Sequence, residues 1–226
     1  HAQPVLWFST EMGEEEVFRR LVFLDARCDP VLIRSRGYAT AEEKRATEDA
    51  TERLRAYPIT VVSAGKLKLS SLAARVRQHV SLVGRTQVLV DHLDHVQADG
   101  EKRVEQMVSI TNLLKALAIE QDINILAVSQ VNRAASQQGD LQLISMRDSS
   151  SKEQDADQVM LLEPVKRGPK GGWQVMTRPE VAEANASSGY ITTRLTVSKN
   201  RSGAEGAVYL RLNWWSGGRF DEMETE

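Results

Sequence analysis

The sequence has 226 residues, of which 41% are hydrophobic and 27% are charged. This composition excludes a disordered chain, and the length suits one large domain or at most two. The 29 basic and 31 acidic side chains leave a net charge of −2, which argues against a general nucleic-acid-binding surface but not against a local one. The single cysteine, Cys28, excludes an internal disulfide and a cysteine-based metal site, and it favours a reducing cytoplasm.

No apolar run approaches the roughly 18 residues that a membrane-spanning helix needs, and no signal-peptide pattern opens the chain. We therefore expect a cytoplasmic protein that does not interact with a membrane. The chain has no initiator methionine and enters an apolar run by Val5. We expect it to be part of a longer protein.

Short apolar runs alternate with helical patterns along the first two thirds of the chain. The runs that predict strands are 5–8, 59–62, 87–90, 123–128 and 159–162. The segments that predict helices are 14–27, 40–56, 71–83 and 102–121. Continuous β-branched runs are typical of parallel strands covered on both faces, so the pattern predicts an α/β fold with a doubly wound, mostly parallel sheet.

The last third has a different character. Residues 168–172 form a Gly/Pro/Lys turn, and residues 178–189 are polar, so we expect a mobile loop there. Residues 190–198 and 207–213 alternate between apolar and polar, which predicts an antiparallel hairpin at the edge of the sheet. Because neither a repeat nor a linker interrupts the chain, we expect residues 1–226 to form a single domain.

Polar residues follow three of the predicted strands: Glu11, Asp91 and Gln130. Ligands of open α/β sheets bind beyond the carboxyl ends of the strands. A carboxylate there can hold Mg²⁺, a second can polarise an attacking water, and an amide can sense a γ-phosphate. Any one of them could simply end its strand, but three in order favour a nucleotide site. The sequence nevertheless contains no G-x-x-x-x-G-K-[ST] phosphate loop.

Several motifs resemble those of the DnaB-type replicative helicases and occur in the same order. They are F-S-T-E-M at 8–12, D-H-L-D at 91–94, N-L-L-K-A-L-A at 112–118, V-S-Q-V-N-R at 128–133, M-R-D-S-S-S-K-E-Q-D-A-D at 146–157 and K-N-R-S-G at 199–203. The resemblance implies a RecA-like motor domain of a hexameric, ATP-driven DNA helicase. It also implies that the Walker A strand, loop and helix lie upstream of residue 1.

The resemblance assigns catalytic roles to five residues, of which all but Gln130 would also bind ATP or its Mg²⁺. Glu11 matches the catalytic glutamate that orients the attacking water, and Asp91 matches the Walker B aspartate that supports Mg²⁺. Gln130 matches the residue that links the nucleotide state to DNA contact. Lys199 and Arg201 match the basic pair that reaches the neighbouring subunit's nucleotide. Two positions apart on a strand, they would share one face. The alternative is an exposed basic pair on an edge hairpin.

The resemblance also implies partners. Arg147, Asp148 and Ser150 match the loop that follows the backbone of single-stranded DNA in the central channel. A homo-hexamer, a primase and a helicase loader are the protein partners that the family suggests. Six such loops around a channel would let a slightly acidic chain hold DNA.

Some residues depart from the family pattern. His92 and Asp94 stand where Tyr and Gln are common, and Ser150 stands where glycine is common. His92 and His95 are spaced i and i+3, but without further ligands we expect no metal site there. Two other functions remain open: a RecA-like module without a phosphate loop that binds DNA or a helicase partner, and a recombinase or loader ATPase of the wider RecA-like class.

Overall fold

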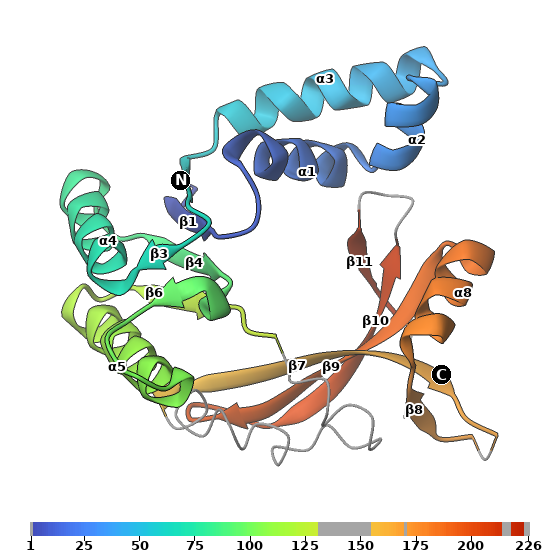
Figure 1. The fold of residues 1–226 in the computed structure, drawn as a ribbon. Helices are drawn as coiled ribbons and strands as arrows, with labels where there is room; N and C mark the ends of the chain where they lie inside the picture. Colours follow the sequence, from blue (N-terminus) through green and yellow to red (C-terminus); the bar gives the residue numbers. More distant parts are fainter. Residues whose placement is uncertain (1, 131–154, 170, 214–217, 224–226) are drawn as a thin grey trace. The chain divides into compact units, whose positions relative to one another are not determined.

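The computed structural model describes residues 2–130, 155–169, 171–213 and 218–223 (Figure 1). Contacts group the chain into two units, one made of residues 1–18 and 55–156 and the other of residues 19–54 and 157–226. The first unit holds a parallel sheet and the second an antiparallel one, which confirms the predicted α/β class. None of the helices in these described ranges is long and apolar enough to span a membrane.

The first unit is built on a four-stranded parallel sheet in the order β2-β1-β4-β6. The strands are β1 (Val5–Ser9), β2 (Ile59–Ser63), β4 (Gln87–Asp91) and β6 (Asn124–Ala127). Ser9 lies opposite Asp91, and Val90 lies opposite Ala127. The carboxyl ends of β1, β4 and β6 therefore meet at one edge, as the four apolar runs predicted. The two-residue strands β3 (Leu67–Lys68) and β5 (Val96–Gln97) pair with each other.

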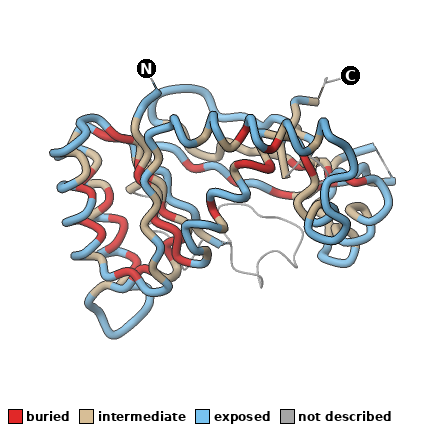
Figure 2. The backbone as a smooth tube through the Cα atoms, turned by 90° about the horizontal axis from the view of Figure 1, so that it is seen from above, coloured by how far each residue is buried: buried red, intermediate tan, exposed pale blue. Residues whose placement is uncertain are grey.

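Helices α4 (Leu69–Val83) and α5 (Arg103–Glu120) supply the helical side of the core of this unit. Leu6 and Phe8 of β1 pack with Leu72, Ile110 and other apolar residues of the two helices and are at most 2% exposed. Burial of each such side chain contributes about 1.5–3 kcal/mol. In Figure 2 buried positions alternate with exposed ones along the helices.

Only one face of the parallel sheet is fully buried by the described residues. The burial of β1 and β4 alternates, so Trp7 and Leu89 are only half-buried, and Leu126 of β6 is 62% exposed. The expectation that both faces are covered is therefore wrong for the described chain. A continuous apolar run gives no indication of which face is covered.

Helices α1 (Glu14–Ala26), α2 (Pro30–Arg36) and α3 (Ala41–Arg55) follow β1. α1 begins in the first unit and continues into the second. An ion pair of 2.7 Å joins Asp25 of α1 to Arg53 of α3. The sequence analysis missed α2, although Asp29 caps it by accepting hydrogen bonds from the N–H groups of Val31 and Leu32.

The second unit contains an antiparallel sheet in the order β11-β10-β9-β7-β8. Its strands are β7 (Gln158–Arg167), β8 (Trp173–Val175), β9 (Tyr190–Asn200), β10 (Gly206–Asn213) and β11 (Arg219–Glu222). The hairpin of β9 and β10 was predicted. Residues 159–162 were expected in the parallel sheet, but β7 runs antiparallel to β9. Apolar residues occupy both faces of β7, with Leu161 buried and Leu162 53% exposed. The sequence therefore did not reveal that burial alternates along this strand.

A second correction concerns residues 178–189, which we expected to form a mobile loop. Residues Arg178–Ser188 form helix α8. Thr177 and Glu180 make a capping box at its start, and Gly189 ends it with a left-handed φ of 70°. The helix buries none of its residues, so it has no apolar stripe for a periodicity argument to find.

Candidate nucleotide site at the carboxyl edge of the parallel sheet

Thr10 connects the ends of β1 and β4. Its N–H and its hydroxyl both donate to the carbonyl oxygen of Asp91, at 2.7 and 3.1 Å. The hydroxyl also accepts the N–H of His92 at 3.0 Å. The peptide between Asp91 and His92 is cis. Because Thr10 is only 3% exposed, these bonds are shielded from water and hold Glu11 next to the segment after β4.

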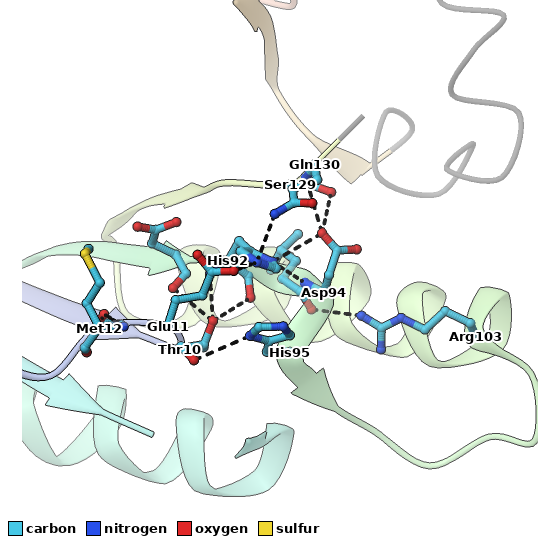
Figure 3. A network of polar contacts seen from close by, with 12 residues as sticks. Thr10, Glu11, Met12, His92, Asp94, His95, Arg103, Ser129 and Gln130 are labelled. Atoms are coloured by element: carbon cyan, nitrogen blue, oxygen red, sulfur yellow. Dashed lines mark hydrogen bonds and ion pairs between the residues drawn. The ribbon is translucent and has the colours of Figure 1, made fainter. Parts of the chain in front are cut away.

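His92 lies at the centre of the site (Figure 3). Its Nε2 is 3.0 Å from Oε1 of Glu11 and 3.4 Å from Nε2 of Gln130. Its side chain is 6% exposed, whereas that of Glu11 is 54% exposed. Two of the three polar residues at the predicted strand ends thus meet on one buried imidazole.

Asp94 contacts the Nδ1 side of the His92 ring. The N–H of Asp94 donates to Nδ1 of His92 at 3.2 Å, and in that tautomer Nε2 carries the ring proton and can donate it to Glu11. Oδ2 of Asp94 accepts the N–H of Gln130 at 3.2 Å and the hydroxyl of Ser129 at 3.4 Å. Asp94 therefore ties the end of β6 to the segment that follows β4.

Arg103, near the start of α5, holds that segment from the other side. Its guanidinium donates to the carbonyl oxygens of Leu93 and Val96, both at 3.0 Å. These carbonyls flank the short 3-10 helix of Leu93–His95. The turn that carries His92, Asp94 and His95 is thereby attached to a helix of the core.

Asp91 is the last residue of β4 and is half-buried. The contacts that join it to Thr10 use its carbonyl oxygen, so the carboxylate can take another role. Mg²⁺ prefers oxygen ligands and is bound through one or two carboxylates plus phosphate oxygens. A carboxylate at this edge of the sheet is chemically suited to hold the Mg²⁺ of a bound nucleotide.

Lys199 and Arg201 lie in the second unit, at the end of β9. Lys199 is within the strand, but the strand ends at Asn200, so Arg201 occupies the following turn. The Arg201 N–H donates to the carbonyl of Asp157 at 2.9 Å, and its guanidinium pairs with the Asp157 carboxylate at 3.0 Å. This exposed pair holds the start of β7 against the end of β9.

Three predicted DNA-binding residues, Arg147, Asp148 and Ser150, lie outside the described residues. Of the E-Q-D-A-D run, Asp155 and Asp157 are described. Asp155 accepts a hydrogen bond of 2.5 Å from the hydroxyl of Thr111 in α5. The run thus contacts Thr111 in the first unit through Asp155, and Arg201 in the second unit through Asp157.

Thr10 and Ser129 were given no role in the site from the sequence, and Asp94 was expected only to add a negative charge near the metal. The signal available for them was their place, since each follows a strand that ends at the same edge. His92 was expected only to depart from the family pattern and to form no metal site with His95. Its position between Glu11 and Gln130 depends on side-chain directions that strand spacing does not reveal.

Comparisons with known proteins identify the family of the chain. Residues 1–217 match the family described as DnaB-like helicase C terminal domain. The replicative DNA helicase DnaB of Buchnera aphidicola subsp. Acyrthosiphon pisum is 29% identical over 230 residues, covering 99% of this chain and 46% of that protein. The DnaB of Haemophilus influenzae is 27% identical, with coverage of 99% and 46%. The chain thus spans about half the length of these curated relatives.

Solved structures show the same fold. A DnaB-like replicative helicase, described together with its interactions with primase, gives a TM-score of 0.81 at 22% identity and covers 98% of this chain and 51% of its own. A second solved structure, described as an ATPase domain, also gives a TM-score of 0.81 at 22% identity, with coverage of 98% and 75%. The chain therefore shares the fold of these two structures. The chain belongs to the DnaB-like helicase C-terminal domain family.

Proposed function

We propose that this chain is the motor portion of a hexameric replicative DNA helicase that couples ATP hydrolysis to movement along single-stranded DNA and to unwinding of duplex DNA. The observation that carries the proposal is the meeting of Glu11 and Gln130 on His92, at the carboxyl edge of a parallel sheet in a chain of this family. Because the family acts on DNA, we propose that the protein works in the cytoplasm.

Within this proposal Glu11 orients the water that attacks the γ-phosphate. The Nε2 of His92 lies 3.0 Å from Oε1 of Glu11, and this contact would hold the carboxylate in position. Asp91 would hold Mg²⁺, which when bound neutralises charge on the phosphate oxygens. Gln130 shares His92 with Glu11, so a change at the nucleotide can reach β6 and the residues that follow it.

The remaining roles concern neighbouring subunits and DNA. We propose that Lys199 and Arg201 stabilise charge on the nucleotide of an adjacent subunit, and that Arg147, Asp148 and Ser150 contact the single-stranded DNA backbone. Primase and a helicase loader are the proposed protein partners. One of the structural neighbours is described with its primase interactions, which supports the first of them.

The substitution Glu11→Gln tests the proposal in the complete protein. We expect the turnover number for ATP to fall by at least about 100-fold, because the amide cannot accept a proton from water. Nucleotide affinity should change little, since the side chain is nearly the same size. Steady-state ATPase rates and binding of a fluorescent ATP analogue measure the two quantities. Unchanged turnover would contradict the role of Glu11.

One observation favours a second candidate. The 226 residues contain no G-x-x-x-x-G-K-[ST] motif, so we propose that they do not hydrolyse ATP by themselves. A RecA-like module that binds DNA or a helicase partner without hydrolysis has the same property. Absence of ATP binding by the complete protein, together with retained DNA binding, would favour this alternative.

A further inference from the structure

Glu11, His92 and His95 bring three metal-ligating side chains to one point. One ligand atom of each lies within 4.8 Å of the other two, and the two imidazole centroids are 4.4 Å apart. Atoms that bind one tetrahedral Zn²⁺ at about 2.0–2.2 Å lie about 3.3–3.6 Å apart, so the three side chains must rotate toward one another by about 1 Å to share an ion. We propose that Glu11, His92 and His95 form a binding site for a divalent transition-metal ion, of which Zn²⁺ fits best.

The surroundings of the two rings support this proposal. Histidines that bind metals commonly donate their second ring N–H to a carboxylate or a backbone carbonyl. Nδ1 of His92 is 3.3 Å from Oδ2 of Asp94, and Nδ1 of His95 is 3.4 Å from the carbonyl oxygen of Thr10. Both rings therefore have an acceptor at Nδ1, which leaves both Nε2 atoms for the ion.

Metal binding requires a change of tautomer at His92. Without the ion, Nδ1 accepts the N–H of Asp94 at 3.2 Å and the proton sits on Nε2. With the ion, Nε2 is a ligand and the proton moves to Nδ1, where Oδ2 of Asp94 can accept it. The ring stays neutral, and Asp94 can serve either tautomer.

The ligand set determines which ion is preferred. Two imidazoles and one carboxylate suit Zn²⁺, Co²⁺ or Ni²⁺, whereas Mg²⁺ takes oxygen ligands. The site is thus chemically distinct from the one proposed for Asp91. Glu11 is 54% exposed, which leaves room for water as a fourth ligand. No site was expected from the sequence because the third ligand, Glu11, comes from the segment after β1.

One consequence rests on the proposed function. Glu11 is the residue proposed to orient the attacking water, so an ion bound to its carboxylate would remove it from that role. Micromolar Zn²⁺ would then inhibit ATP turnover of the complete protein, and a chelator would restore it.

Titration of the 226-residue chain with Co²⁺, without nucleotide or DNA, tests the site directly. We expect one equivalent to bind with the visible absorption of a four-coordinate ion, and Zn²⁺ to displace it. His95→Ala and Glu11→Gln should each weaken Co²⁺ binding by at least about tenfold, and Asp94→Asn by about 10–100-fold. The double variant His1→Ala/His79→Ala removes the other two of the four histidines and should bind Co²⁺ like the unmodified chain.

Failure is equally well defined. If the chain binds no Co²⁺, or if His95→Ala and Glu11→Gln bind it unchanged while their circular dichroism matches the unmodified chain, the proposal is overturned. Loss of binding only in His1→Ala/His79→Ala would also overturn it, because the ion would then lie elsewhere. The titration involves no ATP, so its result is independent of whether the protein is a helicase.

Discussion

At the residue scale, Arg194 and Glu163 form a buried ion pair in the antiparallel sheet. They lie directly opposite each other on β9 and β7, joined at 2.8 Å, and the Glu163 side chain is 3% exposed. The hydrogen bond to Glu163 raises the pKa of Arg194 while burial opposes that shift. Oε1 of Glu163 has no hydrogen-bond partner within the described ranges, so the pair depends on the contacts at Oε2.

Replacing Arg194 should therefore be costly. We expect Arg194→Met to lower the free energy of unfolding by about 3–5 kcal/mol, because it leaves a buried carboxylate without its cation. Urea unfolding at neutral pH measures the change. The double variant Arg194→Met/Glu163→Leu is the control, and it should recover most of the loss because no buried charge remains. If the double variant is as unstable as the single one, lost packing rather than the orphaned charge is responsible.

The same scale shows what sequence could and could not predict about the site. Glu11, Asp91 and Gln130 were predictable because parallel strands place their carboxyl ends at one edge, and the polar residue after each strand follows. The contacts of Glu11 and Gln130 with His92 were not predictable. They depend on the direction in which the His92 side chain points from the turn after β4, and strand spacing does not give that direction. The spacing of His92 and His95 likewise shows nothing of Glu11, which lies 81 residues from His92 in the chain.

At the element scale, helices that bury an apolar stripe were predicted correctly, and helices that bury none of their residues were missed. Helices α4 and α5 were predicted because each buries an apolar stripe against the sheet. Helix α8 was missed because it buries none of its residues, and its start depends on capping instead. The signals were present in Thr177, Glu180 and Gly189, but a polar composition outweighed them in the prediction.

The first turn of α8 makes a pH-dependent contribution to stability. Hydrogen bonds from the Lys166 ammonium and from the N–H and hydroxyl of Thr177 lower the pKa of Glu180 from 4.5 to about 2. Because the folded-state pKa is lowered, the contribution is complete above the unfolded value of about 4.3 and is lost as the pH falls toward 2.

Glu180→Gln tests this dependence. Glutamine can still occupy the capping position, so the variant removes the charge and leaves the helix start intact. We expect the variant to be less stable than the unmodified chain at pH 7 and the difference to shrink steadily below pH 4. Thermal unfolding followed by circular dichroism from pH 7 to pH 2 measures it. Lys166→Met should reduce the same pH-dependent difference. If the stability difference between the unmodified chain and Glu180→Gln does not vary with pH, the charge of Glu180 is not its cause.

At the scale of the whole molecule, the proposed machinery is divided between the two units. Glu11, Asp91 and Gln130 lie at the carboxyl edge of the parallel sheet, and Lys199 and Arg201 lie at the end of β9 in the second unit. A net charge of −2 is compatible with DNA binding if several copies surround the strand, because the phosphate contacts of each copy add up.

Mixing two inactive variants tests whether Arg201 acts on a neighbouring subunit. In the complete protein, Arg201→Ala should lower ATP turnover by about 10³-fold or more if the arginine stabilises the transferring phosphoryl group. Glu11→Gln is expected to be nearly inactive as well. A ring that contains both variants has some interfaces where an intact Glu11 from one subunit faces an intact Arg201 from the next. With random assembly this applies to about a quarter of the interfaces, and ATPase activity should reappear on mixing.

The control is the double variant Glu11→Gln/Arg201→Ala. A ring built only from this variant has no interface with an intact Glu11 and an intact Arg201, so it should remain inactive. If both residues served the same subunit's nucleotide, every subunit in the mixed ring would lack one of them. Mixing would then restore nothing, although each single variant would still be inactive. Recovery on mixing, measured after subunit exchange and compared with the unmixed variants, therefore separates action within a subunit from action between subunits. No recovery despite demonstrated exchange would refute the assignment of Arg201 to the neighbouring site.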